Sequence, residues 1–315
     1  MDPSLPTLSK SRYLAGLQCP KRLWLEVHRR DLLPSAPGAA QQALFDAGNE
    51  VGILARQKWP GGVLVAEDYR HHAEAVEATR RAMADPAVPA VFEAAFTHAG
   101  VRVRVDVLAR SDNADGTWDL VEVKATASVK DVHAPDVAVQ AYVLLGCGVQ
   151  LRRAGILHLD TDYVLGDDGL DLDGLFAFED LLPRLGDSLA KVPGRLALLH
   201  DVVALGDAPE VETGDHCYAP YECPFTQLCV TPPGRYDVGL LPRSARLVAE
   251  MAEVGVSDVR RIPEGTKLSP TQARMVRCVV EEREHVGADL PKALSAFEFP
   301  LVFLDFESAA FPIPR

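Results

Sequence analysis

The sequence predicts an α/β fold, in which a central sheet is flanked by helices, and two observations lead to that prediction. Two runs of alternating apolar residues lie within 101–126, and the period of two is typical of strands. A helical pattern follows them at 135–146, and a further apolar run, LRRAGILHL at 151–159, predicts another strand. Strands that alternate with a helix are typical of an α/β core.

Composition limits the class of protein. The chain has 315 residues, 48% of them hydrophobic, which is enough for one sizeable core and a second, smaller unit. No apolar run reaches the length of about 18 residues that a membrane helix needs, and the start of the chain, MDPSLPTLSK, lacks a signal-peptide hydrophobic region. We therefore expect a cytoplasmic protein with no membrane partner.

Charge is unevenly distributed along the chain. The net charge of −13 argues against adhesion to nucleic acid over the whole surface. Residues 1–31, by contrast, carry an excess of about three positive charges, which leaves room for a local channel.

Helical spacing predicts the remaining elements. Ser9 is expected to cap a helix that Pro20 interrupts. A strand is expected at 91–100, just before the central pair of strands. Further helical patterns occur at 41–59, 67–85, 175–205 and 236–290.

The stretch at 101–126 brings three functional groups together. Asp106 lies within the first strand, while Glu122 and Lys124 lie two residues apart on the second and so share a sheet face. The turn SDNADG predicts a hairpin, which would bring Asp106 beside Glu122. Two carboxylates beside an ammonium suit phosphodiester hydrolysis with Mg²⁺ or Mn²⁺. The alternative is an ordinary Glu–Lys pair on a solvated strand face.

These residues, with two more on the following helix, resemble the PD-(D/E)XK nucleases in their RecB-like branch. The family pattern is an Asp ending one strand, E-x-K on the next, and a helix carrying Gln and often Tyr. The matching positions are Asp106, Glu122, Lys124, Gln140 and Tyr142.

The resemblance implies a restriction-endonuclease-like core with a central mixed sheet, and these five residues as its catalytic residues. It also implies that Glu50, on an early helix, is a further ligand of Mg²⁺ or Mn²⁺ beside Asp106 and Glu122. A surface glutamate is the alternative for Glu50.

Six cysteines occur in the chain, and in the absence of a secretory signal clustered cysteines indicate metal or redox chemistry rather than disulfides. Cys147 and Cys278 are expected to be small core residues. The remaining trio, Cys217, Cys223 and Cys229, has five residues between consecutive members and needs a fourth ligand, for which Cys19 is available.

This arrangement resembles the iron–sulfur site of AddB-type helicase-nucleases and of CRISPR-associated RecB-like exonucleases, in which one cysteine precedes the nuclease core and three follow it. Those relatives often have C-x₂-C-x₅-C, whereas this chain has C-x₅-C-x₅-C. The resemblance implies a structural [4Fe–4S] cluster held by Cys19, Cys217, Cys223 and Cys229 in a helical subdomain. Zinc is the alternative.

The pattern predicts three parts: a nuclease domain at 1–235, a helical module at 236–295, and the first strand of a truncated domain at 296–315. The segment GVSDVRRIPEG at 255–265 predicts either a helix-hairpin-helix that contacts a DNA backbone or a helical spacer. Asp305 and Glu307 near the end of the chain resemble the D-x-E motif of DnaQ-like exonucleases. We therefore expect the chain to be a fragment of a longer protein.

Taken together, these features predict a metal-dependent deoxyribonuclease, an exonuclease on single-stranded DNA in repair, recombination or CRISPR-type processing, with a helicase or a repair or CRISPR protein as its partner. The alternative is a non-catalytic nucleic-acid-binding module stapled by zinc or an iron–sulfur cluster, in which the acidic pair serves only the fold.

Overall fold

The computed structural model describes residues 7–34, 36, 38–111, 116–167, 169–306 and 311–314. The chain divides into two units, of which the first comprises residues 1–226 and 309–315 and the second residues 227–308. The site described below lies within the first unit.

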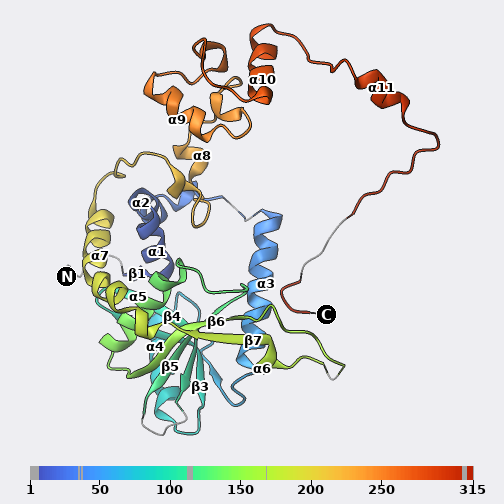
Figure 1. Cartoon of the computed structure of the whole chain (residues 1–315). Helices are drawn as coiled ribbons and strands as arrows, with labels where there is room; N and C mark the ends of the chain where they lie inside the picture. Colours follow the sequence, from blue (N-terminus) through green and yellow to red (C-terminus); the bar gives the residue numbers. More distant parts are fainter. Residues whose placement is uncertain are drawn as a thin grey trace. The chain divides into compact units, whose positions relative to one another are not determined.

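A mixed sheet forms the centre of the first unit (Figure 1). In the described part of the chain it has seven strands in the order β2-β3-β4-β5-β6-β7, with β1 paired to β4. Neighbours from β3 to β5 are antiparallel, whereas β6 runs parallel to β5 and β7 antiparallel to β6. The strands are β1 (Leu8–Ser9), β2 (Val63–Leu64), β3 (Ala90–His98), β4 (Val101–Arg110), β5 (Trp118–Lys124), β6 (Leu151–Leu159) and β7 (Phe176–Asp180).

Helices cover both faces of this sheet, so the predicted α/β core with a mixed sheet is confirmed. The largest apolar cluster joins the sheet to α1, α2, α4, α5 and α7, while a second cluster on the opposite face includes α3. The helices are α1 (Lys10–Gln18), α2 (Pro20–His28), α3 (Ala39–Arg56), α4 (His72–Ala84), α5 (His133–Gly146), α6 (Leu172–Leu175) and α7 (Gly186–Ala204). Short 3₁₀ helices are η1 (Arg30–Leu32), η2 (Leu182–Arg184) and η3 (Asp215–Cys217).

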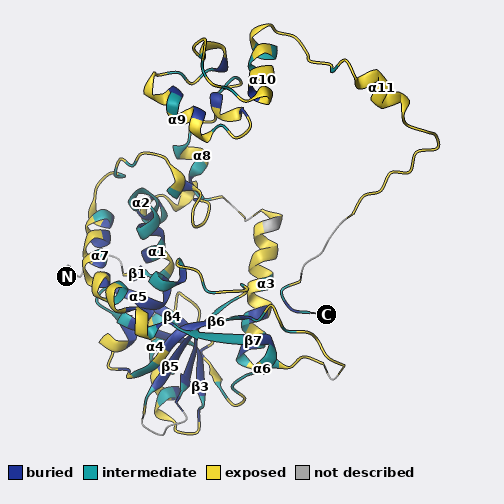
Figure 2. Ribbon diagram, in the orientation of Figure 1, coloured by how far each residue is buried: buried dark blue, intermediate teal, exposed yellow. Residues whose placement is uncertain are grey.

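Alternation along the strands explains the two apolar clusters. On β5, Leu120 belongs to the first cluster and Val121 to the second, and Ile156 and Leu157 on β6 divide in the same way. Successive strand residues point to opposite faces, so an apolar run without alternation can fill both. Figure 2 shows the resulting buried strands, in contrast to the exposed length of α3.

The predicted start of the chain is confirmed. The Ser9 hydroxyl accepts a hydrogen bond from the Arg12 main-chain N–H at 3.2 Å and caps α1. Pro20 occupies the first position of α2, where its missing N–H costs no helical hydrogen bond. Cys19 therefore lies at the junction between two helices.

Three expectations were wrong. The helix expected from 175 begins only at Gly186, because Phe176–Asp180 forms β7 and its alternating phenylalanines pack on the second cluster. Cys147 is exposed, with its thiol donating to the Thr97 carbonyl at 3.3 Å. Cys278 on α10 is half-buried and lies outside the apolar cluster of its unit.

The second unit is helical. Its core contains two turns of related sequence, Asp237-Val238 and Asp258-Val259, in which each aspartate accepts a hydrogen bond from the main-chain N–H two residues later, at 2.7 and 2.8 Å. The two turns are joined by an antiparallel bridge between Asp237 and Asp258. The elements are η4 (Val238–Leu240), α9 (Ala245–Glu253), η5 (Val259–Arg261), α10 (Pro270–Val280) and α11 (Leu290–Ser295), and α8 (Thr226–Cys229) lies at the boundary between the units.

The strand expected near the C-terminal end is not formed in the described residues. Residues 299–306 have no regular structure and pair with no strand among the described residues. Their apolar side chains are exposed, as Phe303 is at 88%. Asp305 lies in this exposed segment, and Glu307 lies outside the described residues. Ile313, beyond that gap, is buried in the second apolar cluster of the first unit. No helix in the described part of the chain is both long and apolar enough to cross a bilayer.

Candidate active site

The site forms where two neighbouring strands separate. β4 and β5 are paired only between 107–110 and 118–121. Beyond this paired segment, the main-chain N–H of Val123 donates to Asp106 Oδ2 at 2.7 Å instead of to a main-chain carbonyl of β4. Continuing the register would pair Asp106 with Glu122, so both residues lie where the pairing of the two strands ends.

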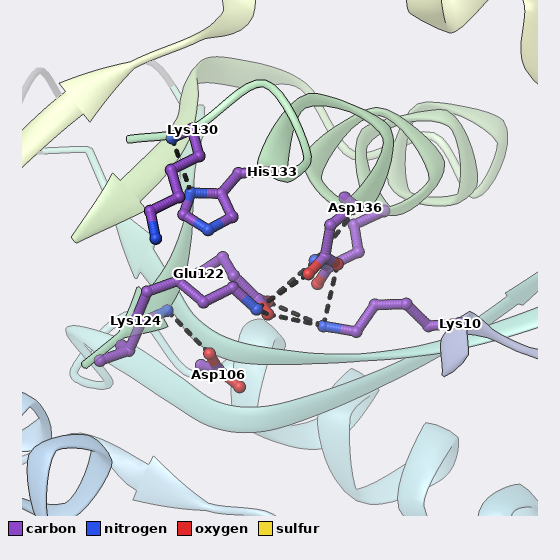
Figure 3. Close-up of polar contacts among 9 residues, drawn as sticks. Lys10, Asp106, Glu122, Lys124, Lys130, His133 and Asp136 are labelled. Atoms are coloured by element: carbon purple, nitrogen blue, oxygen red, sulfur yellow. Dashed lines mark hydrogen bonds and ion pairs between the residues drawn. The ribbon is translucent and has the colours of Figure 1, made fainter. Parts of the chain in front are cut away.

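Glu122 is the centre of the site (Figure 3). Its side chain is buried, and both carboxylate oxygens accept hydrogen bonds. Lys10 Nζ donates to them at 2.8 and 2.9 Å, Lys124 Nζ at 2.6 Å, and Gln140 Nε2 at 2.9 Å. Three elements therefore converge on one carboxylate: the start of α1, the end of β5 and the middle of α5.

A second buried carboxylate, Asp136, shares the same donors. It lies four residues before Gln140 on α5, so both side chains are on one face of the helix. Lys124 Nζ lies 2.9 Å and Lys10 Nζ 3.2 Å from its carboxylate oxygens, and Gln140 Nε2 donates to it at 3.0 Å. The two ammonium groups thus bridge the two carboxylates in a buried network.

Burial and mutual charge shift the pKa values of this network. Burial raises the pKa of Asp106 to about 7, the neighbouring Glu122 adds to the shift, and the lysines only partly offset it. Burial alone would lower the pKa of Lys10 and of Lys124, but the carboxylates outweigh that effect and both pKa values are raised. Both lysines therefore stay protonated at neutral pH and act as donors.

The carboxylates open onto a pocket of about 870 Å³. One wall consists of Asp106, Glu122 and Lys124, and the other is a face of α3. Phe45 and Ile53 on that face are 52% and 61% exposed. The carboxylates are therefore accessible through this pocket between α3 and the sheet.

The structure brings together most of the predicted catalytic residues, but not all. Asp106, Glu122, Lys124 and Gln140 meet, whereas Tyr142 follows Gln140 by two residues and its ring contacts His98 at 5.4 Å between centroids. A step of two residues turns the side chain away from the Gln140 face of the helix. Glu50 is exposed on α3 and does not line the pocket, although the preceding residue, Asn49, does.

Two residues of the network were missed by sequence reasoning. The sequence does indicate Asp136, because its spacing of four from Gln140 predicts a shared helix face. No sequence pattern indicates Lys10. It reaches Glu122 because the two-residue strand β1 pairs in parallel with β4, Leu8 beside Val101, and such a long-range pairing leaves no local pattern.

The donor set fits Mg²⁺ or Mn²⁺ bound in part by water and substrate. No group of three or more His, Cys, Asp or Glu able to hold a metal ion occurs within the described residues. Asp106 Oδ1, however, accepts no hydrogen bond from the described part of the chain. Mg²⁺ is usually held by one or two carboxylates together with water and phosphate oxygens, so two carboxylates at an open pocket suffice.

Three of the four cysteines of the expected cluster belong to the first unit. Gln18 Nε2 donates to the carbonyls of His216 and Tyr221 at 2.6 and 2.7 Å. These bonds hold the end of α1, where Cys19 follows, against the loop that carries the buried Cys217 and Cys223. The Cys223 N–H donates to the Cys217 carbonyl at 2.8 Å, and Cys223 packs with Leu25 and Phe225.

The fourth cysteine, Cys229, ends α8 in the second unit and is half-buried. Two buried thiols and the neighbouring Cys19 are the donors that a thiophilic metal or cluster prefers. Within the described residues, however, these thiols do not form a group of three that could hold a metal ion.

Comparison with known proteins gives little. No family model matches the chain, and no curated protein matches it. Among solved structures, the chain is similar to one titled "Crystal structure of SSO0001", with 15% identity, 71% of this chain and 85% of that chain covered, and a TM-score of 0.32.

The network predicts an asymmetric response to loss of one lysine. Replacing Lys10 by Met leaves Glu122 and Asp136 with a single ammonium, which should lower the free energy of unfolding by roughly 3 kcal/mol. Lys58→Met is the matched control, since the Lys58 side chain is similarly covered, 17% against 20% exposed, but its partner Asp173 is 93% exposed. Its loss should stay below about 1 kcal/mol. Urea unfolding measures both, and equal losses would contradict the account of the network.

Proposed function

We propose that the protein is a metal-dependent nuclease of the RecB-like PD-(D/E)XK class that hydrolyses phosphodiester bonds in DNA, with single strands favoured. The observation that supports this function is the convergence of Asp106, Glu122, Lys124 and Gln140 beside an open pocket. DNA as the substrate comes from the sequence resemblance.

The cost of burial argues against a purely structural role for these charges. Taking carboxylates and ammonium groups out of water is expensive, and apolar residues of similar volume often serve the fold as well. A cluster that serves the fold alone has no need of a pocket. Here Asp106, Glu122 and Lys124 all line one, an arrangement more typical of a functional site.

Asp106 and Glu122, with the main-chain carbonyl of Val123, are the groups that would hold Mg²⁺ or Mn²⁺. When bound, such an ion neutralises charge on the reacting phosphate and lowers the pKa of a bound water. Asp106 is held in place by its hydrogen bond from the Val123 N–H, and Glu122 by its donors on α1 and α5.

Lys124 and Gln140 act through hydrogen bonds. Lys124 is protonated, lies on the pocket wall and already donates to Glu122 and Asp136, so its third N–H is available to donate to a phosphate oxygen or to the attacking water. Gln140 donates to Glu122 and to Asp136, so it is a positioning residue that fixes the orientation of Glu122.

The α3 wall suits a nucleic-acid strand. Phe45 offers an exposed aromatic face at the pocket, and base stacking on aromatic side chains is tolerant of sequence. Asn49 and Gln42 on the same wall add hydrogen-bonding groups. These contacts support a polymeric substrate without base specificity.

We also propose that Cys19, Cys217 and Cys223, with Cys229 as the fourth ligand, hold a [4Fe–4S] cluster. The support is the proximity of the Cys19 segment to the Cys217–Cys223 loop. Such a cluster would close a loop of about 200 residues and restrict the unfolded chain, so its role is structural.

Replacement of Lys124 tests the nuclease proposal. Lys124→Ala and Glu122→Gln should each lower the turnover of Mn²⁺-dependent cleavage of a single-stranded oligonucleotide by at least about 100-fold, because they remove transition-state contacts. Lys191→Ala, at an exposed position on α7, should cleave as the unmodified protein does. Normal cleavage by a folded Lys124→Ala protein would overturn the proposal. No cleavage by the unmodified protein under any divalent cation would favour the non-catalytic binding module.

Metal analysis tests the cluster. Protein purified without oxygen should contain iron and acid-labile sulfide in equal amounts, and Cys19→Ser should lose both. Cys278→Ser, which changes a thiol outside the proposed ligand set, should retain them. A stoichiometric zinc content without sulfide would contradict the iron–sulfur cluster and indicate a structural zinc site instead.

A further inference from the structure

A second pocket of the first unit lies at the start of α1 and is strongly basic. Its volume is about 560 Å³, within the range of ligand pockets. Five of its lining side chains are cationic and one, Glu26, is a carboxylate. This concentration of positive charge is notable because the chain as a whole has a net charge of −13.

Part of this charge already has partners. Glu26 is paired with Arg22 at 2.8 Å, so it does little to neutralise the pocket. Arg104 donates to the carbonyls of Glu67 and Val65 at 2.6 and 3.0 Å and lies 3.5 Å from Glu93, which gives it a structural role.

Lys10 is paired with Glu122, which leaves Arg12, Arg30 and Arg102. Arg12 donates to the Glu26 main-chain carbonyl at 3.1 Å, and Arg102 makes a long contact of 3.5 Å with the Tyr69 carbonyl. Within the described residues, none of the three forms an ion pair with a carboxylate.

The three guanidinium groups repel one another. Burial lowers the pKa of Arg12 and the charge of Arg30 lowers it further, Glu26 opposes this shift, and Arg102 adds a smaller lowering effect. Like charges around one pocket raise the free energy of the unliganded protein, and a bound anion relieves that repulsion.

The backbone and the rim of the pocket favour the same ligand. Ser9, Lys10 and Ser11 form the cap and first turn of α1, where main-chain N–H groups and the helix dipole attract anions. Tyr69, 60% exposed, lies on the wall and offers an aromatic face for a base or sugar.

This pocket adjoins the candidate active site through Lys10. Lys10 lines the pocket, while its Nζ reaches Glu122 at 2.8 Å. The pairing of Ser9 with Arg102 between β1 and β4 fixes the pocket relative to the strand that carries Asp106. A nucleic-acid strand that lay over α1 would therefore contact both this pocket and the candidate active site.

We propose that this arginine pocket, formed by Arg12, Arg30 and Arg102, binds a phosphate group of the substrate strand and holds the strand beside the carboxylates. The inference rests on the proposed function for the identity of the substrate. Two sources supply the same chemistry, an internal phosphodiester of the strand or a terminal phosphomonoester.

Binding measured in EDTA tests the pocket independently of cleavage. We would compare Arg30→Gln/Arg102→Gln with a control of equal charge change, Arg80→Gln/Arg184→Gln, whose exposed arginines pair with Glu77 and Glu179 outside the pocket. The probes are a fluorescent single-stranded oligonucleotide with a 5′-hydroxyl and the same oligonucleotide with a 5′-phosphate. Anisotropy is followed over a range of salt concentrations, and circular dichroism checks the fold.

The pocket variant should bind at least about fivefold more weakly than the control and should lower the slope of log K against log[salt] by roughly 1.4, the value for two lost contacts. Equal weakening for both oligonucleotides indicates an internal phosphodiester, and weakening of the 5′-phosphorylated one alone indicates a terminal phosphate. Binding equal to the control for both probes, with an unchanged slope, would overturn the inference. Cleavage that fails in Mn²⁺ while this binding difference persists would instead count against the nuclease proposal.

Discussion

The first unit depends on neutralising two carboxylates that its fold buries. Glu122 lies on β5 and Asp136 on α5, a helix that packs on one face of the sheet. Each buried carboxylate is tolerated because Lys10 and Lys124 lie between them. Removing one partner of such a network leaves an uncompensated buried charge, which is costlier than any single contact in it. The network therefore joins the sheet to α1 and α5, and two of its members, Glu122 and Lys124, also line the pocket.

Because β4 and β5 separate beside this network, the network lies at an open pocket and is a candidate site as well as a stabilising feature of the fold. Were the ladder to continue past Val121, a main-chain carbonyl would take the Val123 N–H and the strands would close over the gap. Asp106 instead accepts that N–H with one oxygen, and the other accepts no hydrogen bond from the described part of the chain. Charge is then arranged in two zones around Lys10: carboxylates suited to a cation on one side, and arginines suited to phosphate on the other.

Sequence alone predicted the parts of the fold that carry local patterns. Alternation gave β4, β5 and β6, and the cap at Ser9 and the break at Pro20 gave α1 and α2 with their correct junction. Glu122 and Lys124 could be predicted because a spacing of two places them on one sheet face, and Gln140 was predicted from the family resemblance. Lys10 could not, since its position depends on a pairing of residues more than 90 apart in the chain. The strand Phe176–Asp180 was missed because five residues are too few to distinguish from a helical run.

The most direct test of the account is whether Asp106 and Glu122 together bind a divalent cation. Isothermal titration with Mn²⁺ should show one site in the unmodified protein, and Asp106→Asn should weaken it by at least roughly tenfold, as loss of a ligand demands. Asp201→Asn, which changes an exposed carboxylate on α7, should bind Mn²⁺ as the unmodified protein does. Equal affinity in the two variants, or no Mn²⁺ binding by the unmodified protein, would contradict the account.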